Sequence, residues 1–159
     1  MLRRKLGLGA LMFAVGFGLA SAPPAFADST KKTVESVASM LKEAKYKFTQ
    51  NGATFTLEFE AAGMGKFPII IAITDDMLTM LAYVAPAAKI TKSPDLAAGL
   101  LAANNDYAFL KIMFDPKGNL IFRYDAFENM IDADDLKKLI KMMVDNSVNM
   151  YKNAPFIKK

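Results

Sequence analysis

The sequence predicts a single α+β domain: an antiparallel sheet packed by helices, in the order α-β-β-β-α-β-β-α. Three observations support this fold class. Apolar residues recur at helical spacing near both ends of the chain, over 30–45 and 132–154. Most of the sequence between them consists of alternating or wholly apolar runs, which are typical of strands. Turn signals rather than long crossovers join these runs, which favours antiparallel pairing. No internal repeat or interdomain linker is present, so we expect one domain.

Three helices are predicted. The first covers 30–45, where Val34, Val37 and Leu41 share one face. Ser93-Pro94-Asp95 indicates the start of the second, with Ser93 as the cap and Pro94 at the first helical position. It ends near Asn104-Asn105. The third begins at Asp132, where several carboxylates favour a helix start, and it ends before Pro155.

Strands are predicted over 54–60, 67–73, 77–84, 108–114 and 119–127. The segment 46–50 could add a short strand, because Asn51-Gly52 after it is a strong hairpin signal. The turn from Asp115 to Gly118 joins the last two strands. Residues 67–73 are apolar throughout, so we expect that strand to be covered on both faces, or on the second face by a partner.

Residues 1–27 resemble a secretory signal peptide. Basic residues at 3–5 precede an apolar run over 6–20, and Ala25-Phe26-Ala27 has the small-x-small pattern of a cleavage site. The apolar run is shorter than the roughly 20 residues of a spanning helix. We therefore expect cleavage after Ala27, a domain at 28–159, and export to the periplasm or exterior of a bacterium. Membrane contact is expected only through the uncleaved signal peptide.

Composition excludes several kinds of chemistry. The 159 residues include no Cys and no His, which removes disulfides, thiolate nucleophiles, imidazole bases and the commonest metal ligands. Twenty basic residues against 16 acidic ones give a net charge of +4. Three basic residues and no acidic residue lie within 1–27, so the remainder carries 17 against 16, a charge of +1. We therefore expect no nucleic-acid partner.

The acidic clusters have simpler explanations than catalysis or metal binding. Asp132, Asp134 and Asp135 stand at a predicted helix start, where carboxylates stabilise the helix dipole. Asp115 belongs to a turn whose Pro and Lys occupy positions that a calcium loop would give to oxygen ligands. The pair at 75–76 is also expected in a turn. We expect no catalytic residues, no cofactor and no metal site.

The second half of the chain resembles a known family. The helix end 100–104 fits the pattern L-x-x-x-N, which in that family precedes a hairpin of the form F-x-x-D-x-x-G-x-L-x-x-R. Within the segment 109–124, residues 115–123 match the part D-x-x-G-x-L-x-x-R. These residues, with Leu136, Leu139 and Tyr151 on the last helix, resemble the YbjN-type family, which shares the type III secretion chaperone-like fold. The resemblance covers 93–155 by motif and 30–90 by element order. It implies a non-catalytic, chaperone-like module that binds a protein and is often dimeric.

These observations favour an exported, non-enzymatic protein that binds a protein or peptide partner. A regulatory role is compatible with them. We expect contact through the sheet face away from the helices, by burial of side chains or by pairing at a free edge strand. The candidate contact residues are Ile70, Ala72, Phe109, Met113 and Ile121.

Two further hypotheses concern the small-sided second helix and the interior. Ala98, Gly99 and Ala102 could form a homodimer contact, or they could pack within one chain. An alternative function is a carrier of a small molecule or lipid, with an apolar pocket between sheet and helices. An enzyme that uses carboxylates, Lys, Ser or Tyr ranks below both.

Overall fold

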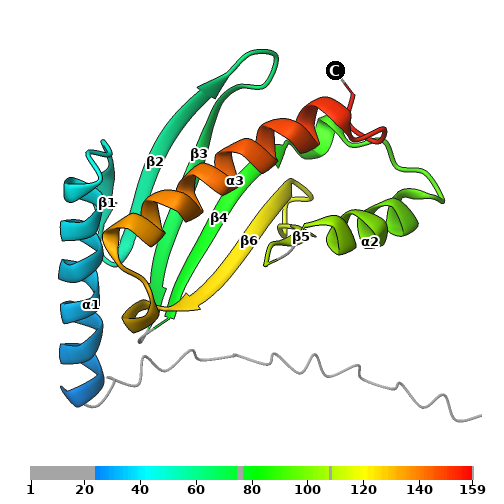
Figure 1. The fold of residues 1–159 in the computed structure, drawn as a ribbon. Coiled ribbons are helices and arrows are strands. Elements are labelled where there is room, and N and C mark those ends of the chain that lie inside the picture. Colours follow the sequence, from blue (N-terminus) through cyan, green and yellow to red (C-terminus); the bar gives the residue numbers. More distant parts are fainter. Residues whose placement is uncertain (1–23, 75–76, 108, 159) are drawn as a thin grey trace, which may run out of the picture.

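The computed structural model describes residues 24–74, 77–107 and 109–158, which fold into one sheet with helices packed against it (Figure 1). Residues 1–23, most of the predicted signal peptide, lie outside the described residues, as does the pair at 75–76. The predicted antiparallel α+β fold is confirmed, and a short strand at the end of the segment 46–50 is added to the predicted order.

Six strands form the sheet in the order β1-β2-β3-β4-β6-β5, and every neighbouring pair is antiparallel. The strands are β1 (Thr49–Asn51), β2 (Thr54–Ala61), β3 (Gly65–Thr74), β4 (Met77–Ala85), β5 (Lys111–Phe114) and β6 (Leu120–Phe127). The apolar strand β3 therefore lies in the middle of the sheet beside β4, as its composition predicts. β1 and β5 are the two edge strands.

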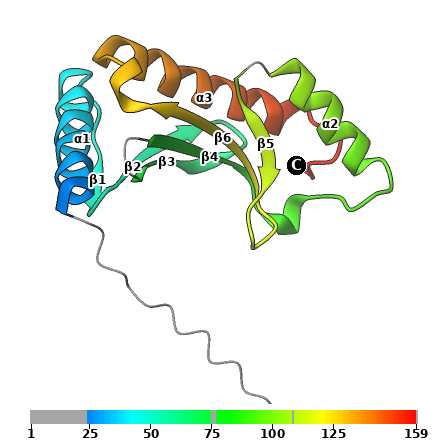
Figure 2. The same cartoon turned by 90° about the horizontal axis from the view of Figure 1, so that it is seen from below.

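The helices are α1 (Pro24–Glu43), α2 (Leu96–Asp106) and α3 (Ala133–Asn153), with 3-10 turns η1 (Ala87–Lys89) and η2 (Glu128–Met130). α1 and α3 contact each other, and α3 lies across β4 and β3 on one face of the sheet (Figure 2). α2 packs beside β5. Among the helices that the structure describes, none is long and apolar enough to cross a membrane.

The helix starts test one predicted cap, Ser93, and one predicted helix start, Asp132. The predicted start of the last helix is confirmed, and Asp132 is its cap, because its Oδ1 accepts a hydrogen bond of 2.8 Å from the backbone N–H of Asp135. The predicted Ser93 cap of the second helix is wrong. α2 begins later, at Leu96, and Asp95 occupies the cap position without a side-chain hydrogen bond. Ser93 instead accepts from the N–H of Leu96 through its carbonyl, in a turn before the helix.

The core lies between the sheet and the α1–α3 layer. One face of the strands contributes alternate apolar side chains, and the helices contribute their apolar stripes. The largest fully buried residues include Phe55, Leu57, Ile69, Ile71, Leu78, Met80, Leu120 and Phe122 from the sheet, with Leu41, Leu136, Ile140 and Met143 from the helices. The alternation predicted for β2 is confirmed, since Phe55 and Leu57 face this core.

The turn between β5 and β6 has the geometry that its sequence predicts. Gly118 adopts a positive φ of 79°, and its N–H bonds the carbonyl of Asp115 at 2.9 Å. The Asp115 carboxylate also accepts from the backbone N–H groups of Lys117 and Asn119, at 2.8 and 2.9 Å. These bonds saturate the carboxylate and fix the hairpin.

The C-terminal segment returns to the middle of the chain. Ile157 pairs with Ile90 in an antiparallel bridge, and the N–H of Thr91 donates to the carbonyl of Phe156 at 2.8 Å. Phe156, Ile157 and Ile90 are all buried. Residues 156–157 are therefore part of the core rather than a tail.

Candidate partner-binding face

The second face of the sheet, here called the open face, is not covered by any of the described helices (Figure 2). Strand register defines which residues share it. Ile70 lies opposite Leu81, Leu81 opposite Arg123, and Arg123 opposite Lys111, so one row crosses β3, β4, β6 and β5. The neighbouring rows follow from the period of two along each strand.

The middle of the open face is apolar. Its apolar members are Pro68, Ile70, Ala72, Leu81, Ile121 and Met113. Most are half-buried among their neighbours, while 37% of Met113 is exposed. An apolar surface across central strands, with no helix of the described chain above it, is suited to contact with another molecule.

Four of the five predicted contact residues lie on this face: Ile70, Ala72, Met113 and Ile121. Ile121 is only 5% exposed, because Tyr83 on β4 and Met113 on β5 lie on either side of it. The fifth, Phe109, is not in a strand, because β5 begins at Lys111 rather than at 108 as predicted. Phe109 is 83% exposed and has a positive φ of 67°.

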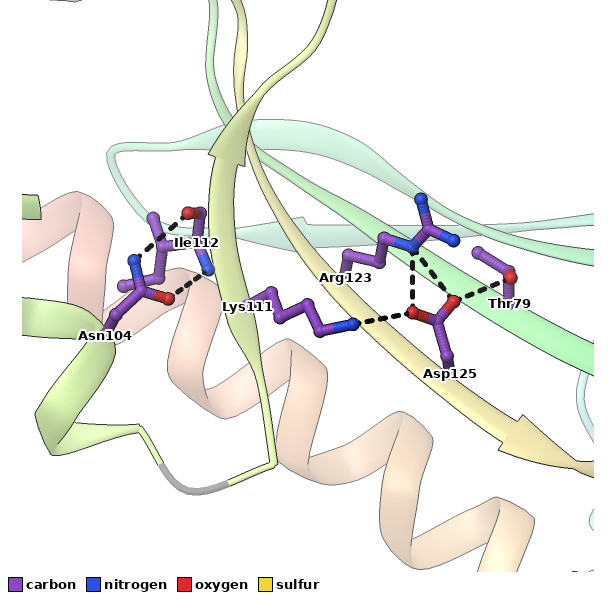
Figure 3. A network of polar contacts seen from close by, with 6 residues as sticks. All are labelled: Thr79, Asn104, Lys111, Ile112, Arg123 and Asp125. Atoms are coloured by element: carbon purple, nitrogen blue, oxygen red, sulfur yellow. Dashed lines mark hydrogen bonds and ion pairs between the residues drawn. The ribbon is translucent and has the colours of Figure 1, made fainter. Parts of the chain in front are cut away.

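A polar network lies beside the apolar residues, on β4, β5 and β6 (Figure 3). The carboxylate of Asp125 accepts from Thr79 Oγ1 at 2.8 Å, from Arg123 Nε at 2.9 and 3.0 Å, and from Lys111 Nζ at 3.2 Å. Sequence reasoning missed this network. Alternation placed the residues on one face, but only the register between strands brings them together.

Asp125 is the centre of this network. Its side chain is 16% exposed, against 41% for Arg123 and 70% for Lys111. Desolvation by burial raises the pKa of Asp125, but hydrogen bonds from Thr79, Arg123 and Lys111 outweigh it, and the net result is a lowered pKa. The carboxylate therefore stays ionised and holds both cations at the surface, so the cluster has a net charge of +1.

Asn104 of α2 closes part of the sheet edge at β5 (Figure 3). Its Oδ1 accepts from the N–H of Ile112 at 2.8 Å, and its Nδ2 donates to the carbonyl of Ile112 at 3.2 Å. The same Nδ2 donates to the carbonyl of Leu100 at 3.1 Å. Both main-chain polar groups of Ile112 are thus occupied, so strand addition at that residue would require displacement of Asn104.

The predicted dimer residues lie on α2, of which no residue is buried. Ala98 and Ala102 are exposed, and Leu101 next to them is 71% exposed. Gly99 faces its own chain: a Cβ added there would lie 3.6 Å from the ring of Phe156. The helix thus combines packing against the C-terminal segment with an outward apolar surface.

The acidic residues form no metal site among the residues that the structure describes, where no group of three or more His, Cys, Asp or Glu could hold an ion. Asp132 and Asp115 accept hydrogen bonds from the backbone instead. The pair at 75–76 lies outside the described residues.

No protein-family model matches the chain, and no curated protein sequence matches it. Solved structures do match in fold. A chain of the ExsC–ExsE complex has a TM-score of 0.63 at 12% identity, covering 79% of this chain and 96% of its own. A chain of the HopA1–SchA chaperone–effector complex has a TM-score of 0.59 at 13% identity, covering 82% and 99%. YbjN from E. coli has a TM-score of 0.54 at 15% identity, covering 74% and 88%.

These likenesses support the expected fold. The chain shares its α+β architecture with type III secretion chaperones and with YbjN. At these identities the comparison concerns the fold alone.

Proposed function

We propose that the protein is an exported, non-enzymatic, chaperone-like module that binds an apolar segment of a protein partner on the open face. The observation that carries the proposal is the apolar surface of the central strands, centred on Ile70 and Leu81, which the described helices leave uncovered. The fold shared with a chain of a chaperone–effector complex supports a protein as the partner. Export rests on the pattern of residues 1–27.

The mode of binding that we propose is burial of side chains rather than extension of the sheet at β5. Asn104 already occupies the main-chain groups of Ile112 on that edge strand. The partner would cover Met113, which is 37% exposed, together with Ile70 and Leu81. The polar network around Asp125 would border the contact and favour an acidic or polar group of the partner beside Arg123 and Lys111.

Capture of the partner from the native envelope fraction tests this proposal. The tagged protein, expressed from its full sequence, is compared with Met113→Lys and with Met130→Lys. Met130 is 74% exposed and lies in η2, outside the strands, so it provides a matched control. We expect Met113→Lys alone to reduce capture, at least about fivefold, because a charge would be desolvated in the contact. Equal capture by all three, with unchanged melting temperatures, would refute the open face as the contact.

We also propose self-association through α2. Ala98, Leu101 and Ala102 give this helix an outward apolar surface that its own chain leaves exposed. Light scattering of the purified protein should report a dimer, and Leu101→Glu should shift it to a monomer. Met130→Glu, at similar exposure, should leave the mass unchanged. A monomeric parent protein would exclude this part of the proposal without affecting the open face.

A further inference from the structure

A cavity of about 430 Å³ lies where β3 begins and β4 ends. Its apolar walls are Met64, Phe67, Pro68, Val84, Ala85 and Pro86. The register between β4 and β6 shifts between Tyr83 and Ala85, and such an irregularity bends a strand locally. The volume is within the range of about 300–1,000 Å³ that is common for small-molecule sites.

The polar groups of this sheet-end cavity are mainly donors. Lys66, Lys89 and Tyr151 line it, and none of the described lining residues is acidic. Lys89 donates a hydrogen bond to the Tyr151 hydroxyl and lies 5.0 Å from the centroid of that ring. Among the described residues, neither lysine forms an ion pair, and the proton of the Tyr151 hydroxyl has no assigned acceptor. Tyr151 is only 5% exposed, so water reaches it poorly.

Asp115 is not a lining residue, but it bonds two residues that are, and among the described residues it forms no ion pair with either lysine. Asp115 bonds the hydroxyl of Tyr83, at 3.3 Å, and the side-chain amide of Asn119, at 2.8 Å, besides the backbone of its own turn. Desolvation raises the pKa of Asp115, but these hydrogen bonds outweigh it and lower the pKa. The Asp115 carboxylate is thus ionised and already accepts hydrogen bonds at both oxygens. Lys89 and the Tyr151 hydroxyl have no anionic partner among the described residues.

We propose that the sheet-end cavity binds a small amphiphilic carboxylate: one anionic head on a short hydrocarbon body. The head would accept from Lys89 Nζ and the Tyr151 hydroxyl, with Lys66 adding charge, and the hydrocarbon would lie against the apolar walls. Both parts are needed. A strongly hydrated inorganic anion would gain nothing from Phe67, Pro68 and Val84. A neutral hydrocarbon would leave the proton of the buried Tyr151 hydroxyl without an acceptor. The cavity shares Pro68 with the open face, but Lys89 in η1 and Tyr151 in α3 lie outside that face, so the proposal does not depend on the open-face contact.

Calorimetric titration of the protein, expressed from its full sequence, tests the proposal with three probes: octanoate, octanol and acetate. We expect saturable 1:1 binding of octanoate, at least about tenfold tighter than octanol, because a charge-assisted hydrogen bond is lost in the alcohol. Acetate should bind more weakly still, because it lacks the hydrocarbon. Octanoate that binds no more tightly than octanol, or shows no saturation, would overturn the proposal.

Variants locate the site. Lys89→Met keeps the side chain's length and removes its charge, and Tyr151→Phe removes only the hydroxyl; each should weaken octanoate at least about fivefold. Lys152→Met is the matched control: Lys152 is exposed, adjacent to Tyr151 and absent from the described lining. Its affinity should equal that of the parent protein. If Lys89→Met and Tyr151→Phe both melt like the parent and bind octanoate equally well, the assignment is wrong. If one of them unfolds, the other decides the outcome.

Discussion

The side-chain amide of Asn104 pairs with both main-chain groups of Ile112, as a neighbouring strand would. An edge strand presents unpaired N–H and C=O groups, and these attract other chains unless they are covered. One residue of α2 therefore does two things. It covers this position of the β5 edge, and it attaches a helix without buried residues to the sheet.

Asn104→Ala should destabilise the protein by about 1–2 kcal/mol, because the N–H and C=O of Ile112 would lose their partners in a partly buried place. The free energy of unfolding from urea titration measures this, and hydrogen exchange at the Ile112 amide should become faster. Asn105→Ala, at the exposed neighbouring position, is the control. Asn105→Ala should cause no loss, because alanine has a higher helix propensity than asparagine. A loss for Asn104→Ala that is no larger than that for Asn105→Ala would contradict the role of the pairing with Ile112.

The pH dependence of stability should include a contribution from Asp125. Its pKa is lowered in the folded protein from the ordinary value of 3.8, so the unfolded chain takes up the proton first as pH falls. The stabilisation is complete above 3.8 and disappears as pH falls through the lower folded value. Asp125→Asn should therefore cost about 1 kcal/mol at pH 7 and less at pH 2.5.

Urea titrations at the two pH values check the prediction for Asp125. Asp145→Asn, which breaks the exposed pair with Lys141, serves as the control. We expect it to change stability little at either pH, because exposed pairs contribute little. A cost for Asp125→Asn that is the same at pH 2.5 and pH 7 would contradict the role of the carboxylate charge.

Asp132→Ala should remove the cap of α3 and destabilise the protein by about 1 kcal/mol. The hydrogen bond from the N–H of Asp135 would be lost, and that donor has no intrahelical partner. Thermal unfolding followed by circular dichroism measures the change. Asp134→Ala, in the same turn but without a capping bond, should cost clearly less. The reverse order would mean that the charge near the helix end matters more than the cap.

Phe109→Asn should stabilise the isolated protein by up to about 1 kcal/mol, because asparagine tolerates the left-handed backbone better than a bulky residue does. The ring contributes little to packing, since it is 83% exposed. Urea titration of the two proteins measures the difference. A loss of stability would show that the ring has contacts in solution that its exposure does not suggest.

Much of the fold follows from local pattern. Alternation over 54–60 predicted which residues of β2 face the core, and Asp115 to Gly118 predicted the hairpin, because turn chemistry and side-chain period are local properties. The predictions were wrong where tertiary structure overrides these local preferences. Serine is a residue type that favours helix caps, but Asp95 rather than Ser93 occupies the cap position of α2. Residue 109 is apolar like the strand after it, yet it adopts a left-handed backbone.

The candidate site was predictable only in part. Periodicity placed Ile70 and Met113 on the open face, since each strand alternates. It could not show that Leu81 lies opposite both Ile70 and Arg123, because pairing between strands depends on register. The sheet-end cavity was beyond sequence reasoning for the same reason. Lys89 and Tyr151 are far apart along the chain, and only the return of α3 over the sheet brings them together.

The bridge between Ile157 and Ile90 has a consequence for the timing of folding. The core at this end of the sheet stays incomplete until residues 156 and 157 have been synthesised, because Phe156 and Ile157 are buried in it. We expect the protein truncated after Asn153 to be cleaved rapidly by protease, and the protein that includes residues 154–158 to resist.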